Sequence, residues 1–202
     1  MGESDHPFAE IEESFKRAVA VLQRAEIPFV LGGSLAVWAH GGPETRNDLD
    51  FMVRPEDAEH ALEALVDAGM RAERPPEDWL VKVRDGDVLI DLIHHPTGFT
   101  ITDDVIARGE RKIVAAMELR VMAVEDILTS KLLALGEHSL DLEGSLQLAR
   151  ALREQIDWAQ VRARSEHSPY ARAFLHLVDE LAISGGRQAA SEPRHRRVRV
   201  VE

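Results

Sequence analysis

The stretch Phe29–Val53, FVLGGSLAVWAHGGPETRNDLDFMV, constrains the fold more than any other part of the chain. A short apolar run breaks at Gly32-Gly33-Ser34, and an amphipathic helical segment follows. A polar loop then leads to a second apolar run that carries Asp48 and Asp50. The pattern predicts a strand, a glycine-serine turn, a helix and a second strand in close succession, which favours a mixed α/β fold.

Two carboxylates, Asp48 and Asp50, mark the start of the second apolar run. Side chains two apart in a strand point to the same face, so we expect these two side by side. Like charges at that spacing raise each other's pKa unless a cation lies between them. Carboxylates completed by substrate phosphates suit Mg²⁺, so the pair predicts a magnesium site. The alternative is a pair of acids at a solvent-facing strand edge.

The turn residues Gly33 and Ser34 precede the predicted helix. Free N–H groups and the helix dipole at such an N-terminus favour phosphate. The alternative is a simple helix cap. A phosphate cradle and a metal pair within one segment together predict a site for a magnesium-bound nucleotide.

The overall composition limits the class of protein. A chain of 202 residues, 45% hydrophobic and 30% charged, is typical of one or two soluble domains. It contains no cysteine, which fits a cytoplasmic location. No stretch resembles a signal peptide or a membrane span, so no membrane partner is expected. The net charge of −12 argues against sequence-blind binding to nucleic acid but allows an RNA end to be held locally.

Another carboxylate, Asp91, interrupts the run Val88–Ile93, which is apolar on both faces. Such a run predicts a strand covered on both sides, paired in a hairpin with Trp79–Val83 through a turn at Asp85-Gly86. An isolated buried carboxylate costs several kcal/mol unless it is paired or metal-bound. Asp91 therefore needs a partner, unless it lies at a fraying strand end or bonds to a local backbone amide.

Helical spacing of apolar residues returns in the second half of the chain. In VEDILTSKLLALGEH, Lys131 falls at the margin of the apolar stripe, where its ammonium could reach a phosphate or simply lie along the surface. Asp141 precedes the next helix and could be its N-cap. The other expected elements are helices over 10–25, 55–69, 101–108, 142–152 and two within 157–183, and a hairpin of 112–115 with 119–123 around Met117-Glu118.

The order Gly-Gly-Ser, spacer, Asp-Leu-Asp resembles the signature of the nucleotidyltransferase (polymerase-beta-like) superfamily. The wording GGSLAVWAHG…DLDFMV is most similar to AbiEii/MenT-type toxins, with aminoglycoside and lincosamide nucleotidyltransferases as neighbours. The resemblance covers roughly residues 25 to 150. Before the acidic pair the family usually has Arg, a spacer and Thr, whereas this chain has Thr45-Arg46-Asn47.

The resemblance implies roles for residues outside the first motif. The family's third carboxylate, on a strand beside the acidic pair, matches Asp91, which would hold a second ion or deprotonate the attacking hydroxyl. The family's later motifs, a Lys on a helix after the sheet and an Asp beyond it, match Lys131 and Asp141. Around that Asp the family often has a basic residue before and an acid three after, but this chain has Leu140 and Gly144.

We therefore expect an α/β (α+β) protein with a small mixed sheet flanked by helices. The expected divisions are a core over 1–123, a helical part over 124–184 and a basic tail over 185–202, which steers RNA or only adds solubility. The expected activity is Mg²⁺-dependent transfer of a nucleotide from an NTP to a hydroxyl. By the resemblance, the acceptor is a tRNA 3′ end and the partner a cognate antitoxin. The alternatives are transfer to an antibiotic-type small molecule and a non-catalytic nucleotide-binding module.

The expected site has three groups of residues. The acids Asp48, Asp50 and Asp91 bind the metal and, with Lys131, form the catalytic set. Gly33 and Ser34 hold the β- and γ-phosphates of the NTP. Lys131 and Asp141 complete the nucleotide-binding set.

Overall fold

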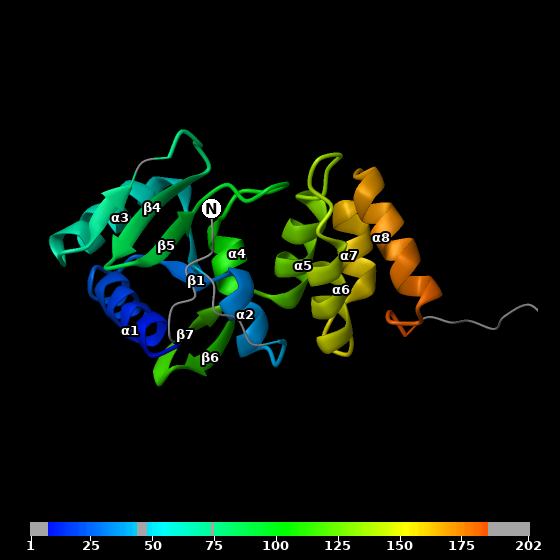
Figure 1. Ribbon diagram of the computed structural model, residues 1–202, viewed down its shortest axis with the longest axis horizontal. Coiled ribbons are helices and arrows are strands. Elements are labelled where there is room, and N and C mark those ends of the chain that lie inside the picture. The colour runs from blue at the N-terminus through cyan, green and yellow to red at the C-terminus, as the bar shows by residue number, and fades with distance from the viewer. Residues whose placement is uncertain (1–7, 44–47, 74, 186–202) are drawn as a thin grey trace, which may run out of the picture.

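The computed structural model describes residues 8–43, 48–73 and 75–185, with side-chain surroundings from residue 11 onward. Within these ranges the strands form one seven-stranded sheet in the order β3-β4-β5-β2-β1-β7-β6. Helices flank this sheet, and the helices α5 to α8 form a second lobe beside it (Figure 1). The expected α/β fold class is confirmed.

The bounds of the elements agree closely with the hydrophobic pattern. The strands are β1 (Phe29–Leu31), β2 (Leu49–Val53), β3 (Arg71–Glu73), β4 (Leu80–Asp85), β5 (Val88–Ile93), β6 (Glu110–Val114) and β7 (Met117–Val121). The helices are α1 (Phe8–Arg24), α2 (Gly33–Ala39), the 3-10 turn η1 (Pro55–Asp57), α3 (Ala58–Asp67), α4 (Asp103–Arg108), α5 (Val124–Leu133), α6 (Leu142–Ala151), α7 (Trp158–Ser165) and α8 (Pro169–Glu180).

Strand β2 lies at the centre of the sheet and carries the key register. It pairs antiparallel with β1 and parallel with β5, which places Asp50 directly opposite Asp91. On the other side of β5, the antiparallel strand β4 places Lys82 opposite Asp91. Residues paired across a sheet point to the same face, so these three side chains form one row.

The opposite face of the sheet carries the main apolar core. Phe51, next to Asp50 along β2, points away from the row and stacks on Phe15 of α1, with ring centroids 6.1 Å apart. Phe29 of β1 meets the same ring edge-on at 5.6 Å. Helices α1 and α3 pack on this side, against β5 and β4. The alternation along β2 thus buries one face and keeps the acidic face for other partners.

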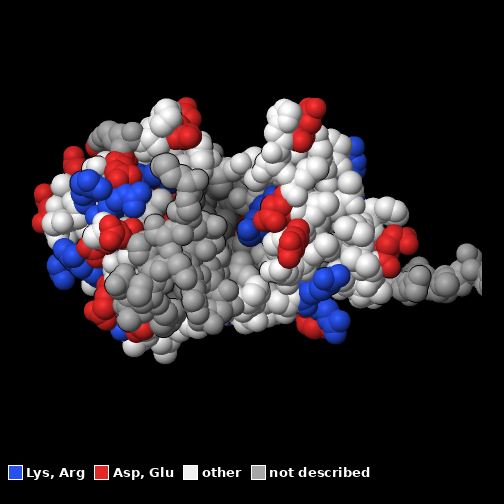
Figure 2. All heavy atoms as spheres, in the orientation of Figure 1, with Lys and Arg blue, Asp and Glu red and all other residues white. Residues whose placement is uncertain are grey.

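Helix α5 connects the sheet to the second lobe. It packs against α6, α7 and α8, and it also contacts α2 beside the sheet. A hollow separates the sheet lobe from the helical lobe in the space-filling view (Figure 2). No helix within the described ranges is long and apolar enough to cross a bilayer. The division of the chain into a core over 1–123, a helical part over 124–184 and a tail over 185–202 stays a prediction.

The turn of the last hairpin differs from the expectation. Strands β6 and β7 turn at Ala115-Ala116, both with positive φ (47° and 65°), rather than at Met117-Glu118. This geometry is usually occupied by Asn or Gly, and alanine gives no such sequence signal. Met117 instead begins β7 on the same face as buried Leu119. The short strand β3 (Arg71–Glu73) was also not expected, because it is polar and mostly exposed.

Candidate active site

The row across β2, β5 and β4 forms the centre of the site. Asp91 is buried, and its carboxylate is paired: the Lys82 Nζ donates hydrogen bonds to Oδ1 at 2.9 Å and to Oδ2 at 2.8 Å. Asp91 needed a partner, and the described structure supplies a lysine rather than a backbone amide. The hairpin register could have predicted this pair, because a turn that places Asp85 opposite Val88 places Lys82 opposite Asp91.

The carboxyl group of Asp50 is electrostatically the most perturbed of the row. The residue as a whole is partly accessible to solvent. Its carboxyl group is nevertheless surrounded by protein, and this desolvation is the largest cause of a pKa raised to about 7. The negative charges of Asp91 and Asp48 raise the pKa further, whereas the nearby ammonium groups of Lys131 and Lys82 lower it. Three acids therefore crowd one place on the sheet.

Burial also raises the pKa of Asp91 above its ordinary value, and the hydrogen bond from Lys82 opposes that rise. The charge of Asp48 adds to the rise, and that of Arg84 lowers it. The Asp91 carboxylate is thus bound by Lys82, and its negative charge also acts on Asp50.

Asp48 lies just before β2 rather than within it, because the strand begins at Leu49. Asp48 is exposed and lies one residue before the strand. The predicted placement of Asp48 and Asp50 side by side on one strand is therefore wrong. Its charge still reaches Asp50. The residues Thr45-Arg46-Asn47, singled out by the sequence, lie outside the described residues, as does the basic tail from residue 186 onward.

The turn at Gly33 touches the acidic row directly. Gly33 has a φ of +58°, and a Cβ built there would lie 1.8 Å from the Asp50 Oδ2. The Gly32 N–H donates to the Asp50 backbone O at 2.8 Å. Ser34 follows in the first turn of α2 and is partly buried. Because α2 has only seven residues, backbone N–H groups rather than a long helix dipole would attract a phosphate here.

The two later site residues differ in their placement. Lys131 lies in the last turn of α5, partly buried, and it is close enough to lower the pKa of Asp50. Asp141 is exposed and caps α6, where its Oδ1 accepts a hydrogen bond from the Gly144 N–H at 2.9 Å. A Cβ at Gly144 would lie 2.6 Å from Asp141 Oδ2, which explains the glycine there. The capping alternative thus accounts for Asp141, and its nucleotide role stays a prediction.

A divalent cation fits at Asp48 and Asp50, which have no ion pair with another described residue. No group of three His, Asp or Glu side chains within the described ranges is arranged to hold a metal by itself. However, Asp48 and Asp50 offer hard oxygen ligands, and Mg²⁺ commonly takes only one or two carboxylates together with substrate phosphates. Burial is the largest cause of the raised pKa of Asp50, and a cation between Asp48 and Asp50 would relieve the part that comes from repulsion by neighbouring acids.

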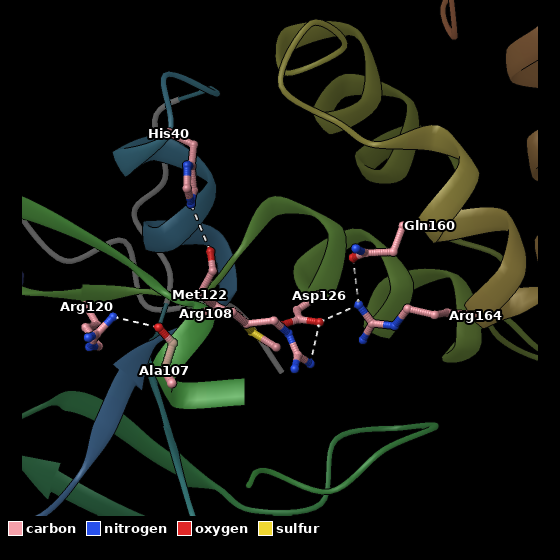
Figure 3. Close-up of polar contacts among 8 residues, drawn as sticks. All are labelled: His40, Ala107, Arg108, Arg120, Met122, Asp126, Gln160 and Arg164. Carbon is pink, nitrogen blue, oxygen red and sulfur yellow. Dashed lines mark hydrogen bonds and ion pairs between the residues drawn. The ribbon is translucent and has the colours of Figure 1, made fainter. Parts of the chain in front are cut away.

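An ion cluster around the fully buried Asp126 joins the two lobes (Figure 3). Asp126, fully buried at the start of α5, accepts hydrogen bonds from Arg108 of α4 at 2.8 and 3.1 Å. Arg164 of α7 pairs with the same carboxylate at 2.5 Å and lies 5.6 Å from the Phe99 ring. No local sequence pattern predicts this cluster, because its members are far apart along the chain. It holds α5, and therefore Lys131, against the sheet lobe.

Helix α2 has its own anchor at its C-terminal end. The buried His40 ring places its Nε2 2.9 Å from the Met122 O, just after β7 (Figure 3). Burial lowers the pKa of His40, so the ring is held neutral and its Nε2 donates this bond. The Gln155 side chain donates to the His40 backbone O at 2.9 Å. These bonds fix the helix that carries Gly33.

A cavity of about 720 Å³ lies elsewhere, between the end of α1, the start of β1 and the β6–β7 hairpin. No carboxylate of the row lines it. Its polar groups bond to one another: Gln23 donates to the Glu118 backbone O, and Arg111 pairs with the Glu118 carboxylate. We therefore place the site by the convergence of charged groups on the sheet, not by cavity size.

In this fold, Asp50 of β2 lies against the glycine turn between β1 and α2, and Asp91 of β5 lies beside it. The family described as "Uncharacterised nucleotidyltransferase" matches residues 10–181, so the chain belongs to that family. The chain is thus an enzyme of the nucleotidyltransferase kind. A comparison with curated proteins found no match.

Solved structures share the fold at low identity. The antibiotic-resistance factor ANT(2'')-Ia is 19% identical with a TM-score of 0.61, and the match covers 86% of this chain and 98% of that one. The lincosamide antibiotic adenylyltransferase LnuA, in its lincomycin-bound structure, is 14% identical with a TM-score of 0.51, covering 73% and 98%. A putative nucleotidyltransferase from H. pylori is 18% identical with a TM-score of 0.50, covering 89% and 83%.

Proposed function

We propose that this protein transfers a nucleoside monophosphate from an NTP to the hydroxyl group of an acceptor and releases pyrophosphate. The observation that supports the proposal most strongly is the pairing of Asp50 with Asp91 on one face of the sheet, with the charge of Asp48 close to Asp50 and Gly33 against the Asp50 carboxylate. Phosphoryl-type transfer depends mainly on positioning and charge neutralisation. The acidic row and its neighbouring lysines offer both.

Each residue has a defined part in this proposal. The backbone at Gly33 and Ser34 would bind the β- and γ-phosphates. Asp48 and Asp50 would hold Mg²⁺, which neutralises charge on the triphosphate when bound. Lys131, near Asp50, would bind the triphosphate as a fixed cation.

In the transfer, one bond to the α-phosphorus forms and one bond to it breaks. The acceptor oxygen attacks the α-phosphorus, the bond from that phosphorus to the bridging oxygen of the β-phosphate breaks, and pyrophosphate leaves. Asp91 is the acid on the β4 side of the row and would take the proton of the attacking hydroxyl. Asp50, enclosed beside Gly33, stays on the nucleotide side.

Two acceptor classes are proposed. The first is a small-molecule hydroxyl, because this chain spans almost the whole length of the antibiotic-modifying enzymes it resembles in fold. Its net charge of −12 also suits a cationic acceptor. The second is a tRNA 3′ end, in the role of a toxin with an antitoxin partner. The support for it is the similarity of the first motif to AbiEii/MenT-type toxins.

The two acceptors can be separated by one labelling experiment. The protein is incubated with each α-labelled NTP and Mg²⁺, together with either total tRNA or a panel of aminoglycosides and lincosamides. Label on one acceptor class identifies it, and Asp50→Asn should abolish the transfer. Label on neither class would count against both acceptors. For the toxin role, overexpression should inhibit growth, and Asp48→Ala should relieve that inhibition.

A further inference from the structure

At the β4 end of the acidic row lies Lys82, which the sequence motifs did not assign to the site. The Lys82 Nζ lies 2.9 and 2.8 Å from the two oxygens of Asp91. The Lys82 side chain is 26% exposed and that of Asp91 11% exposed, so the pair is largely removed from water. A pair in such surroundings is screened by salt far less than a surface pair.

The geometry of the pair restricts what else Asp91 can bind. An ionised carboxylate has about four lone-pair sites, and the lysine occupies one on each oxygen. A neutral hydroxyl can still donate to a remaining site. A divalent cation on those sites would lie close to the ammonium, and the like charges would repel strongly at low dielectric. Asp91 is thus suited to a hydroxyl and unsuited to a metal.

The other half of the row has the opposite character. Among the described residues, neither Asp48 nor Asp50 has an ion pair of the kind that Lys82 makes with Asp91, so their carboxylate oxygens remain available to a cation. Gly33 leaves no room for a side chain against the Asp50 carboxylate. A cation is therefore favoured at Asp50 and Asp48 but opposed at Asp91.

We propose that Lys82 is a positioning residue that reserves Asp91 for the acceptor hydroxyl and limits the site to one divalent cation, held by Asp48 and Asp50. This inference rests on the proposed function. It also places the acceptor over β4 and β5, on the side of the row away from the glycine turn.

The first test counts bound metal, with Mn²⁺ alone as the probe followed by electron paramagnetic resonance. We expect one Mn²⁺ per wild-type chain. Lys82→Met frees Asp91 and should bind a second Mn²⁺, or the same ion at least about fivefold more tightly. The double variant Lys82→Met/Asp91→Asn should return to the wild-type value, because the released carboxylate is removed.

The chain offers a closely matched control in Lys112. It also lies on a strand of the sheet, is 25% exposed and pairs with Glu110 at 3.1 Å, but it is remote from the row. Lys112→Met should leave Mn²⁺ binding unchanged. Equal Mn²⁺ binding by wild type and Lys82→Met would overturn the inference. Equal binding by wild type and Asp50→Asn would instead overturn the proposed metal site, so the two failures are distinguishable.

The second test uses kinetics once the acceptor class is known. Lys82→Met should lower kcat about 100-fold, as expected for a misplaced reacting group, and change the KM for the NTP by less than threefold. Lys82→Arg retains the charge and should recover part of kcat. Urea unfolding of both variants checks that they fold. If both variants fold and the kcat of Lys82→Arg is no higher than that of Lys82→Met, the positioning role is contradicted.

Discussion

The contact between Gly33 and Asp50 leads to a prediction in which two effects can be separated. Gly33→Ala places a Cβ at a φ of +58° and only 1.8 Å from Asp50 Oδ2, 2.6 Å from Cγ and 2.9 Å from Cβ. The first effect is backbone strain and the second is a steric clash. Rotation of the Asp50 side chain cannot remove the contact between the new Cβ at position 33 and the Cβ of Asp50, because the Asp50 Cβ does not move in such a rotation.

The expected magnitude follows from adding the two effects. A left-handed backbone costs a non-glycine residue about 1–2 kcal/mol. Forcing extra volume into a packed place costs typically about 1–3 kcal/mol. We therefore expect Gly33→Ala to lower the free energy of unfolding by about 2–5 kcal/mol. Activity should fall at least about 100-fold in the folded fraction, because Asp50 is displaced by an ångström or more.

The matched control is Gly86→Ala, in the β4–β5 turn. Gly86 has a φ of +60°, almost the same as Gly33, but a Cβ built there meets nothing within 4 Å. Urea unfolding of both variants, with kcat/KM of the folded protein, measures the two effects. Gly86→Ala should show only the backbone strain and keep full activity. If Gly33→Ala costs no more stability than Gly86→Ala and leaves kcat/KM unchanged, the inferred contact with Asp50 is wrong.

Three further predictions concern charge. Asp126→Asn removes the fully buried acid shared by Arg108 and Arg164, whose side chains are 41% and 27% exposed, and should cost about 1.5–3 kcal/mol in urea unfolding. Asp179→Asn, whose pair with Arg162 is 39–40% exposed, should cost less than about 1 kcal/mol; equal costs would contradict the burial argument. The pKa of Asp50 rises from 3.8 to about 7 on folding, so the folded state keeps a proton that the unfolded chain has lost, and stability in EDTA should fall by at most about 4 kcal/mol as pH rises from about 4 to 7. Asp50→Asn should flatten that profile, and an unchanged slope would refute the assignment. Lys131→Met should raise the KM for the NTP about 10–100-fold through the loss of one charged contact, while Lys16→Met, on a helix of the opposite face, should not; the same KM in both would exclude Lys131 from nucleotide binding.

The sequence predicted the fold where local pattern and chain order agree. The apolar run of β5 was placed at Val88–Ile93, and the structure has the same bounds. The turn before α2 and the strand with Asp50 were also expected in order. The predicted position of the β6–β7 turn was wrong, because the turn lies at Ala115-Ala116 and no turn residue marks it, while the packing of buried Leu119 and partly buried Met117 sets the hairpin.

The candidate site residues were predicted from the segment Phe29–Val53 and from the resemblance to nucleotidyltransferases. The acids at 50 and 91 lie side by side through the pairing of β2 with β5, which no local pattern encodes. The cation Lys82 was missed because a lone lysine in a strand carries no signal until the hairpin register is applied. The Asp126 cluster joins three helices, and only the folded chain brings them together.

That cluster has a consequence for any attempt to shorten or recombine this protein. A fragment that ends before α7 would lose Arg164 and leave Asp126 buried with Arg108 alone. The sheet lobe is therefore not an interchangeable module. A chimera that joins the sheet lobe to another helical lobe would need an arginine at the position of Arg164. Otherwise Asp126 would have to be replaced together with Arg108.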